Sequence, residues 1–245
     1  VARLIVEHPG VSHGYERDHY FNFWFTLAIP PTTDIETELE RLTSAVEAEA
    51  IFSLPAVKLF KIRAYFAMDD KVQSATDTVY HPDGILPHKV ELSQTDRSLI
   101  NELQRDLPLI PQPFTAMSAR LDMGVVDFLS QCRSLKKRGI MRRFGAAINH
   151  KQVGFKANAM ACWIVPSDMV DDIGRKLASL REVSHCYERK TNPLWSYNLF
   201  AMIHGHTREV CQEIASKISD ETGIRGYILL FSTREFKKVR IKYQV

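Results

Sequence analysis

The sequence has few cysteines, little net charge and no long apolar run. Its four cysteines, at positions 132, 162, 186 and 211, contain no C-x-x-C pair, so neither a zinc ribbon nor a disulfide framework is predicted. No apolar stretch reaches the roughly 18 residues of a membrane helix and no signal-peptide pattern occurs, so we expect a cytoplasmic protein in a reducing compartment. The net charge of +3 is too small to indicate nucleic-acid binding by itself.

A seven-residue phrase occurs twice in the chain. Residues 11–17 read VSHGYER and residues 183–189 read VSHCYER, and the similarity extends into the flanking residues. Internal repeats decide how a fold is interpreted. The chain is therefore expected to contain two copies of one structural unit.

The later copy has the pattern of a complete unit. A strand is predicted over 159–165, a helix over 167–180 capped by Ser167, and two strands over 183–189 and 197–204. A second helix over 207–223, between Thr207 and Gly223, is followed by strands over 226–232 and 238–243. The first six of these elements give the order β-α-β-β-α-β, which is typical of a ferredoxin-like α+β fold.

The earlier copy is predicted to be incomplete. Strands are expected over 11–17, 20–29 and 58–66 with a helix over 34–46, but the first strand and most of the first helix of the unit are missing. A half unit would leave open sheet edges. We therefore expect either a missing N-terminal part of the first copy or a partner chain to complete the sheet.

A helical region separates the two copies. Residues 69–89 are polar and contain proline and glycine, as in a linker, and helices are predicted over 92–106, 113–123 and 125–140. With MRRFGAAIN as a wing, they resemble a winged helix-turn-helix. The predicted domains are thus a partial first copy (1–68), a linker (69–89), a helix-turn-helix domain (90–142) and the second copy (143–245).

Strand alternation places the valine, histidine, tyrosine and arginine of the repeated phrase on one face, and the serine and glutamate on the other. A guanidinium beside an imidazole and a phenol is suited to binding a carboxylate and delivering a proton. The alternative is a solvated sheet face inherited by duplication.

Histidines and aromatic residues are frequent near these strands. The nine histidines form no H-E-x-x-H or similar spacing, so a bound-metal enzyme is not indicated. They could act as general acids, ligate the iron of a cofactor, or simply be satisfied surface residues. The tryptophans and their aromatic neighbours are either core residues or the walls of a pocket for a flat ligand.

The helical region also contains a short basic run, Lys136 to Arg138 with Arg142 and Arg143, that could contact phosphates. Asp127, Phe128 and Leu129 occupy the part of the third helix where base-reading residues stand in DNA-binding proteins. A structural or dimerising role is therefore the alternative to DNA recognition.

Several longer motifs resemble known families. LSQTDRSLINELQRD and SLKKRGIMRRFGAAIN resemble the Lrp/AsnC regulators, whereas VSHGYERDHYFNFWFTLAIP, NHKQVGFKANAMACWIVP and CYERKTNPLWSYNLFAMIHG resemble the siroheme decarboxylases of heme d1 and alternative heme biosynthesis. Members of two types pair in that family. The repeat then resembles a fusion of the two partner subunits.

The resemblance implies a decarboxylase that removes the C12 and C18 acetate carboxyl groups of siroheme as CO2, giving 12,18-didecarboxysiroheme. It implies no added cofactor, since the iron comes with the tetrapyrrole substrate, and a dimer or higher assembly. PLIPQPF (108–114) places three prolines where DNA-binding relatives run more tightly from helix to helix, which argues against DNA binding, and the lack of a long apolar run argues against a membrane partner. The implied catalytic residues are His13, His19, His150, His185, His204, Tyr15 and Tyr187. The implied substrate-binding residues are Arg17, Arg189, Arg143, Lys151, Trp24, Trp195 and Asn198.

Two other functions remain open from the sequence. One is an Lrp/AsnC-type transcription regulator with a small-molecule-sensing domain. The other is a tetrapyrrole carrier that has a pocket but no proton donor.

Overall fold

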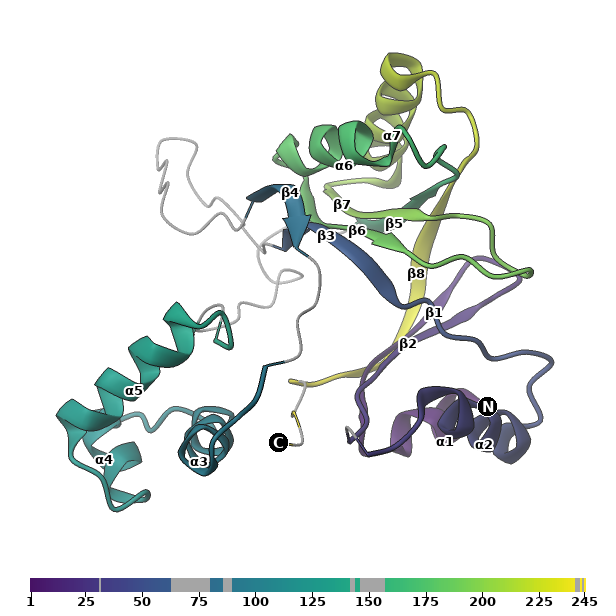
Figure 1. Ribbon diagram of the computed structural model, residues 1–245. Coiled ribbons are helices and arrows are strands. Elements are labelled where there is room, and N and C mark those ends of the chain that lie inside the picture. The colour runs from purple at the N-terminus through teal and green to yellow at the C-terminus, as the bar shows by residue number, and fades with distance from the viewer. Residues whose placement is uncertain are drawn as a thin grey trace.

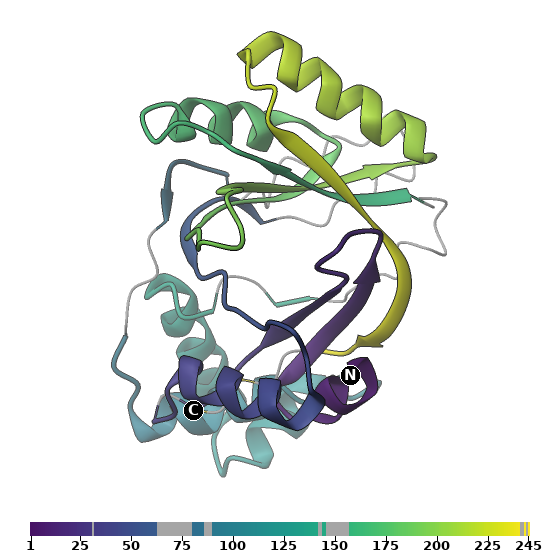
Figure 2. The same ribbon diagram turned by 90° about the vertical axis from the view of Figure 1, so that its right-hand side faces the viewer.

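The structure, a computed structural model, describes residues 1–30, 32–62, 80–85, 90–141, 144–145, 157–240, 243 and 245, with the backbone alone for 80–85. Its main feature is an eight-stranded sheet (Figures 1 and 2). The strand order is β2-β1-β8-β5-β7-β6-β3-β4, and neighbouring strands pair antiparallel throughout. The strands are β1 (Val11–Arg17), β2 (Phe23–Leu27), β3 (Ala56–Ile62), β4 (Tyr80–Ile85), β5 (Ala157–Trp163), β6 (Val183–Arg189), β7 (Leu199–Gly205) and β8 (Tyr227–Lys238).

The second copy forms the predicted ferredoxin-like unit. Its elements follow the order β5, α6 (Val170–Ser179), β6, β7, α7 (Arg208–Thr222) and β8, and its strands lie side by side as β8-β5-β7-β6. Thr207 caps α7 through the Val210 N–H, and Gly223 ends the helix in the left-handed conformation, as predicted. Ser167 does not cap α6 as predicted, because a turn closed by the Met169 N–H on the Pro166 carbonyl delays the helix until Val170.

The first copy divides its strands between the two sides of this unit. β1 and β2 extend the sheet from β8, whereas β3 pairs with β6 at the opposite side. The predicted strand 226–232 continues without a turn as one long strand, β8, because residues 232–238 pair with β1. Part of the predicted strand 238–243, residues 241 and 242, lies outside the described residues. β4 lies inside the predicted linker 69–89 and pairs with β3.

Helices cover one face of the sheet in each copy. α6 and α7 pack on the second copy over a core that includes Trp163, Leu177 and Ile203. α1 (Ala2–Glu7) and α2 (Ile35–Val46) pack with β1 and β2, where Ile5 and Val46 are buried. Among the described residues, these four helices leave the opposite face of the sheet uncovered.

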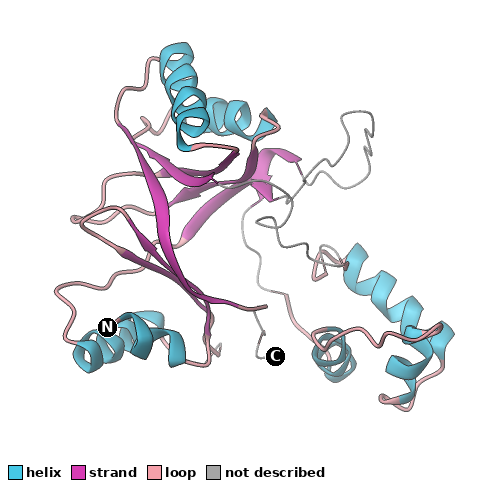
Figure 3. Cartoon of the chain, turned by 180° about the vertical axis from the view of Figure 1, so that it is seen from behind, coloured by secondary structure: helices cyan, strands magenta, loops and turns pink. Residues whose placement is uncertain are grey.

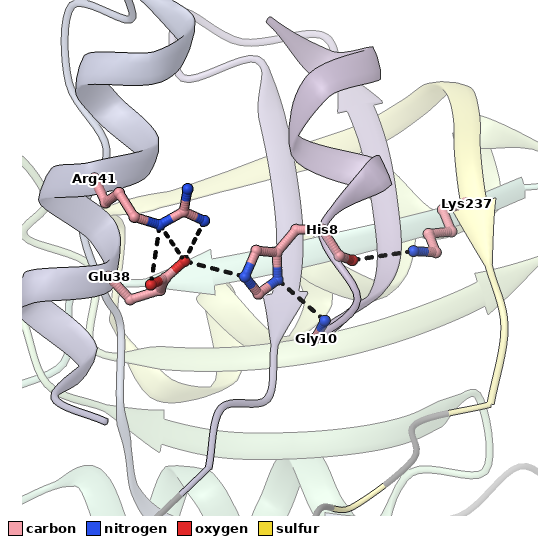
Figure 4. A network of polar contacts seen from close by, with 5 residues as sticks. All are labelled: His8, Gly10, Glu38, Arg41 and Lys237. Carbon is pink, nitrogen blue, oxygen red and sulfur yellow. Dashed lines mark hydrogen bonds and ion pairs between the residues drawn. The ribbon is translucent and has the colours of Figure 1, made fainter. Parts of the chain in front are cut away.

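A polar network links α1, α2 and β8 (Figure 4). Glu38 accepts from Arg41 in the next turn of α2 and pairs with His8 at 3.0 Å. The other ring nitrogen of His8 accepts from the Gly10 N–H, and Lys237 Nζ donates to the His8 carbonyl. This network fixes the two helices of the first copy against β8, a strand of the second copy.

The helix-turn-helix region forms a separate small core. Its helices are α3 (Gln94–Leu103), α4 (Pro113–Ala119) and α5 (Val125–Lys137), which lie apart from the sheet (Figures 1 and 3). Ser93 and Asp96 make a capping box at the start of α3, and Asp96 also pairs with Arg138 after α5. The predicted wing falls largely outside the described residues.

The paired columns as a candidate active site

The same β-bulge interrupts β1 and β6. Val11 pairs with Leu27 while His13 pairs with Thr26, so one extra residue, Ser12, is inserted at this point of β1. Ser184 occupies the same place in β6, where the strand register shifts between Val183 and His185. A bulge re-aims the side chains beside it.

The bulge corrects one prediction about the repeated phrase. Simple alternation placed the valine on the face of the histidine, but Val11 and Val183 are buried in the cores beneath the helices. The serines instead bond to the histidines that follow them: Ser12 Oγ lies 2.9 Å from Nδ1 of His13, and Ser184 Oγ lies 2.7 Å from Nδ1 of His185.

The predicted histidine, tyrosine and arginine lie in line in both copies, and we call these two sets the first column (His13, Tyr15, Arg17) and the second column (His185, Tyr187, Arg189). The histidine and tyrosine ring centroids are 6.2 Å apart in each column. Each arginine lies over the ring of its tyrosine, at 5.8 Å in the first column and 5.1 Å in the second. Duplication has thus preserved the local geometry as well as the sequence.

Both columns lie on the sheet face opposite α6 and α7. Tyr15 pairs with Trp24, and Tyr187 pairs with Phe200, so each tyrosine shares the face of its partner. Trp195 contacts both partners, with ring centroids 5.0 Å from Trp24 and 6.3 Å from Phe200. One aromatic cluster therefore connects the two columns across the sheet.

The two arginines have similar anchors. Nη1 of Arg17 donates to the Leu230 carbonyl at 2.8 Å, and Nη1 of Arg189 donates to the Leu54 carbonyl at 2.7 Å. Burial lowers the pKa of both guanidinium groups. Burial also raises the pKa of the Cys162 thiol, and the two arginines only partly oppose this shift, so the thiol between them stays neutral. Arg17 is 6% exposed, and its Nε has no hydrogen-bond partner among the described residues.

The first column faces charged residues of β8. Lys238 pairs with His13 and Glu235 pairs with Tyr15. Burial and then Lys238 lower the pKa of His13, while Glu235 opposes them. Burial and Glu235 raise the pKa of Tyr15 to about 12, so the phenol stays protonated at neutral pH.

The second column faces apolar residues of β3, because Leu59 pairs with Tyr187 and Ile62 pairs with His185. Its polar support comes from β5 and β7 instead. Ser184 Oγ lies 2.6 Å from Nε2 of His204, and Nδ1 of His204 lies 2.6 Å from Oδ1 of Asn158. The two columns therefore share their shape but differ in their surroundings.

Several other predicted residues lie away from the histidines of the columns. His19 follows β1, accepts from the Phe21 N–H and meets the edge of Trp195 at 5.5 Å. Trp195 is buried in the aromatic cluster, and Trp24 is partly buried and packs against it beside the columns. The Asn198 side-chain amide accepts from the Val165 N–H and donates to the Val165 carbonyl, both at 2.8 Å.

Three predicted residues, Arg143, His150 and Lys151, lie outside the described residues. Five residues of the site escaped the sequence analysis: Ser12, Ser184, Asn158, Glu235 and Lys238. The repeated phrase contains the two serines, so its repetition was a signal for them. The other three are brought to the columns only by strand pairing, which the sequence does not specify.

Within the described ranges, no group of three or more histidine, cysteine, aspartate or glutamate side chains could hold a metal ion. The same part of the chain has no helix long and apolar enough to cross a membrane.

Two family models match the chain. The AsnC-like ligand binding domain matches residues 1–61 and 152–237, and the siroheme decarboxylase NirDL-like HTH domain matches residues 96–142. The first match covers both copies and the second lies between them, as the fold requires.

Curated relatives and solved structures agree with these matches. The siroheme decarboxylase of Hydrogenobacter thermophilus is 39% identical over 99% of this chain and 72% of its own length. The siroheme decarboxylase beta subunit of Methanosarcina barkeri is 40% identical, over 62% of this chain and 99% of its own. The crystal structure of the siroheme decarboxylase NirDL has a TM-score of 0.74 at 36% identity, covering 100% of this chain and 70% of its own.

The leucine response regulatory protein LrpA of Mycobacterium tuberculosis shares the fold alone. It is 20% identical with a TM-score of 0.53, over 62% of this chain and all of its own. The longer and closer matches carry the assignment: this chain belongs to the siroheme decarboxylase family.

Proposed function

We propose that this protein removes the acetate carboxyl groups at C12 and C18 of siroheme as CO2, giving 12,18-didecarboxysiroheme. The observation that carries the proposal is the duplicated column, because the substrate presents two equivalent reactions and the chain presents two equivalent sets of residues. A NirDL structure that contains an iron-uroporphyrin III analogue matches 99% of this chain and 68% of its own, at 36% identity and a TM-score of 0.73.

The reaction needs a proton donor from the protein. The bond between the acetate methylene and its carboxylate breaks, and the electron pair stays on the methylene carbon, where the attached macrocycle delocalises it. A proton must then reach this carbon to give a methyl group, so an acid has to lie at the substrate edge. The iron arrives with the substrate, and we propose no added cofactor.

The arginines suit the binding of carboxylates. With Nη1 of Arg17 held by the Leu230 carbonyl, Nε and Nη2 form the remaining edge of the guanidinium, which is the bidentate edge for a carboxylate. A ligand oxygen would also satisfy the buried Nε. Arg189 has the corresponding anchor in the second column.

The histidines suit proton delivery. His13 and His185 stand at the far end of each column from the arginine, with a tyrosine between. The raised pKa of Tyr15 makes this phenol a hydrogen-bond donor rather than the acid that gives up its proton. We therefore assign the proton-donating role to the two histidines, with one column serving each acetate.

The proposal also includes a paired assembly and a cytoplasmic location for the protein. A paired assembly is supported by relatives that are named as beta subunits and match 62% of this chain. A cytoplasmic location is supported by four free cysteines, which a reducing compartment would maintain. Arg143, His150 and Lys151 remain proposed ligands of the substrate.

The direct test is anaerobic incubation of the full-length protein with siroheme, followed by mass spectrometry of the tetrapyrrole. The expected result is loss of two CO2. Siroheme recovered unchanged, with the protein folded and the tetrapyrrole bound, would instead support a carrier or sensor.

A further inference from the structure

We propose that Asn158, His204 and Ser184 form a one-directional hydrogen-bond chain that holds His185 in its Nδ1–H tautomer, making His185 and His13 unequal proton donors. The members come from three neighbouring strands, β5, β7 and β6. The chain of hydrogen bonds stands on geometry alone, whereas its catalytic consequence rests on the proposed function.

The direction of the chain follows from which atoms can donate. Oδ1 of Asn158 is a carbonyl oxygen and only accepts, so Nδ1 of His204, 2.6 Å away, carries the proton between them. In neutral His204 the other nitrogen, Nε2, then accepts, and the Ser184 hydroxyl 2.6 Å away donates to it.

Ser184 has one hydroxyl proton, and His204 takes it. The remaining contact, 2.7 Å between Ser184 Oγ and Nδ1 of His185, must therefore be a bond that Nδ1–H donates to the hydroxyl oxygen. With the proton of Nδ1 engaged by Ser184, we assign the gain and loss of a proton to the other ring nitrogen of His185, Nε2. The β-bulge makes this possible, because it turns Ser184 towards the same side as His185 and His204.

The first column has no counterpart of this chain in the described part of the structure. His13 pairs with Thr26 of β2, and His185 pairs with Met202 of β7. Two residues beyond these partners, the second copy has His204, whereas the first copy has Ala28. Ser12 lies instead 2.7 Å from Thr26 Oγ1. Two hydroxyl groups can each donate or accept, so this pair fixes neither tautomer of His13.

The difference has a chemical consequence. Protonated His185 gives its Nε2 proton to the methylene carbon and returns to the same neutral tautomer, ready to be recharged at the same nitrogen. The imidazolium loses one proton, the carbanion gains it, and no ring rotation is needed. Fixing a tautomer through a partner on the other ring nitrogen is a known way to tune a histidine.

The tautomer can be measured without substrate. We would label the histidines of the full-length protein with 15N and record long-range proton–nitrogen NMR spectra above the pKa of His185. The expected wild-type spectrum shows Nδ1 protonated and Nε2 bare. Protonation of Nε2 instead, in the neutral ring, would overturn the proposal.

Asn158→Asp provides a reversal test. A carboxylate beside His204 favours the doubly protonated ring, so Nε2–H of His204 then donates to Ser184 and Ser184 must donate to Nδ1 of His185. The expected result is a switch of His185 to the Nε2–H tautomer. An unchanged His185 tautomer in Asn158→Asp would contradict the proposed hydrogen-bond chain.

Ser184→Ala and Ser12→Ala form a matched pair at the two bulges. We expect Ser184→Ala to lower kcat about tenfold to a hundredfold with little change in KM, the size typical of lost supporting contacts. Ser184→Thr, which keeps the hydroxyl, should restore the rate, while the His185 tautomer in Ser12→Ala should equal that of the wild type. NMR measures the His185 tautomer without turnover, so this tautomer test stays valid even if the protein proves not to be a decarboxylase. Loss of the Nδ1–H tautomer in Ser12→Ala would overturn the proposal.

Discussion

Arg17 donates to the backbone carbonyl of Leu230 at 2.8 Å, joining the first copy of the repeat to the second across β1 and β8. The bond fixes which edge of the guanidinium is left for a ligand. It also makes the position of the first column depend on β8, a strand of the other copy.

Arg17→Lys should therefore separate charge from geometry. Lysine keeps the positive charge but cannot offer two parallel N–H groups. We expect kcat/KM for siroheme to fall about tenfold to a hundredfold, corresponding to about 1.5–3 kcal/mol for a hydrogen bond to a charged group. Steady-state kinetics would check this, with Arg208→Lys on the exposed ion pair to Asp18 as the control. Equal kcat/KM for Arg17→Lys and wild type would show that the Arg17 guanidinium does not bind the substrate.

Lys238→Met should raise the pKa of His13, because the ammonium group lowers it in the wild type. Glu235→Gln should lower it further, since the carboxylate is the opposing influence. NMR titration of the His13 ring checks both directions. Because the pKa of His13 is lower in the folded state than in the unfolded state, the free energy of unfolding decreases as the pH falls below the unfolded pKa of this histidine. Lys238→Met should make this decrease smaller. Parallel shifts in the two variants would contradict the assigned causes.

Gly174→Ala should destabilise the contact between the copies. A Cβ at this position of α6 would lie 2.5 Å from the ring of Phe60 on β3, which is fully buried. Overpacking of this kind costs about 1–3 kcal/mol. Thermal or urea unfolding of Gly174→Ala would measure it, and Phe60→Leu in the same chain should recover part of the loss. An unchanged midpoint would mean that β3 does not pack on α6 in this way.

Arg138→Ala should weaken the helix-turn-helix region most at neutral pH. Arg138 and the Ser93 cap hold the pKa of Asp96 down to about 2, below its ordinary value. A lowered folded-state pKa contributes stability above the unfolded pKa near 4 and loses it as the pH falls towards 2. The variant should therefore differ from wild type at pH 7 and converge with it near pH 2, as followed by circular dichroism. A difference that grows on acidification would be the wrong sign.

The repeat made much of this architecture predictable. The phrase VSHxYER gave the two copies, and strand period placed His13, Tyr15 and Arg17 on one face. The same rule misplaced Val11 because a bulge adds a residue without any signature of its own in one sequence. The division of the first copy between β8 and β6 was also hidden, since strand partners depend on long-range pairing. Asn158, Glu235 and Lys238 join the site only through that pairing.

The products that His13→Ala and His185→Ala form from siroheme under anaerobic conditions test whether each column serves one acetate. If each column serves one acetate, each variant should accumulate a monodecarboxylated siroheme, and NMR should show that the two products are different isomers. The wild type should lose both carboxyl groups. Full double decarboxylation by either variant, or the same single isomer from both, would contradict the assignment of one acetate to each column.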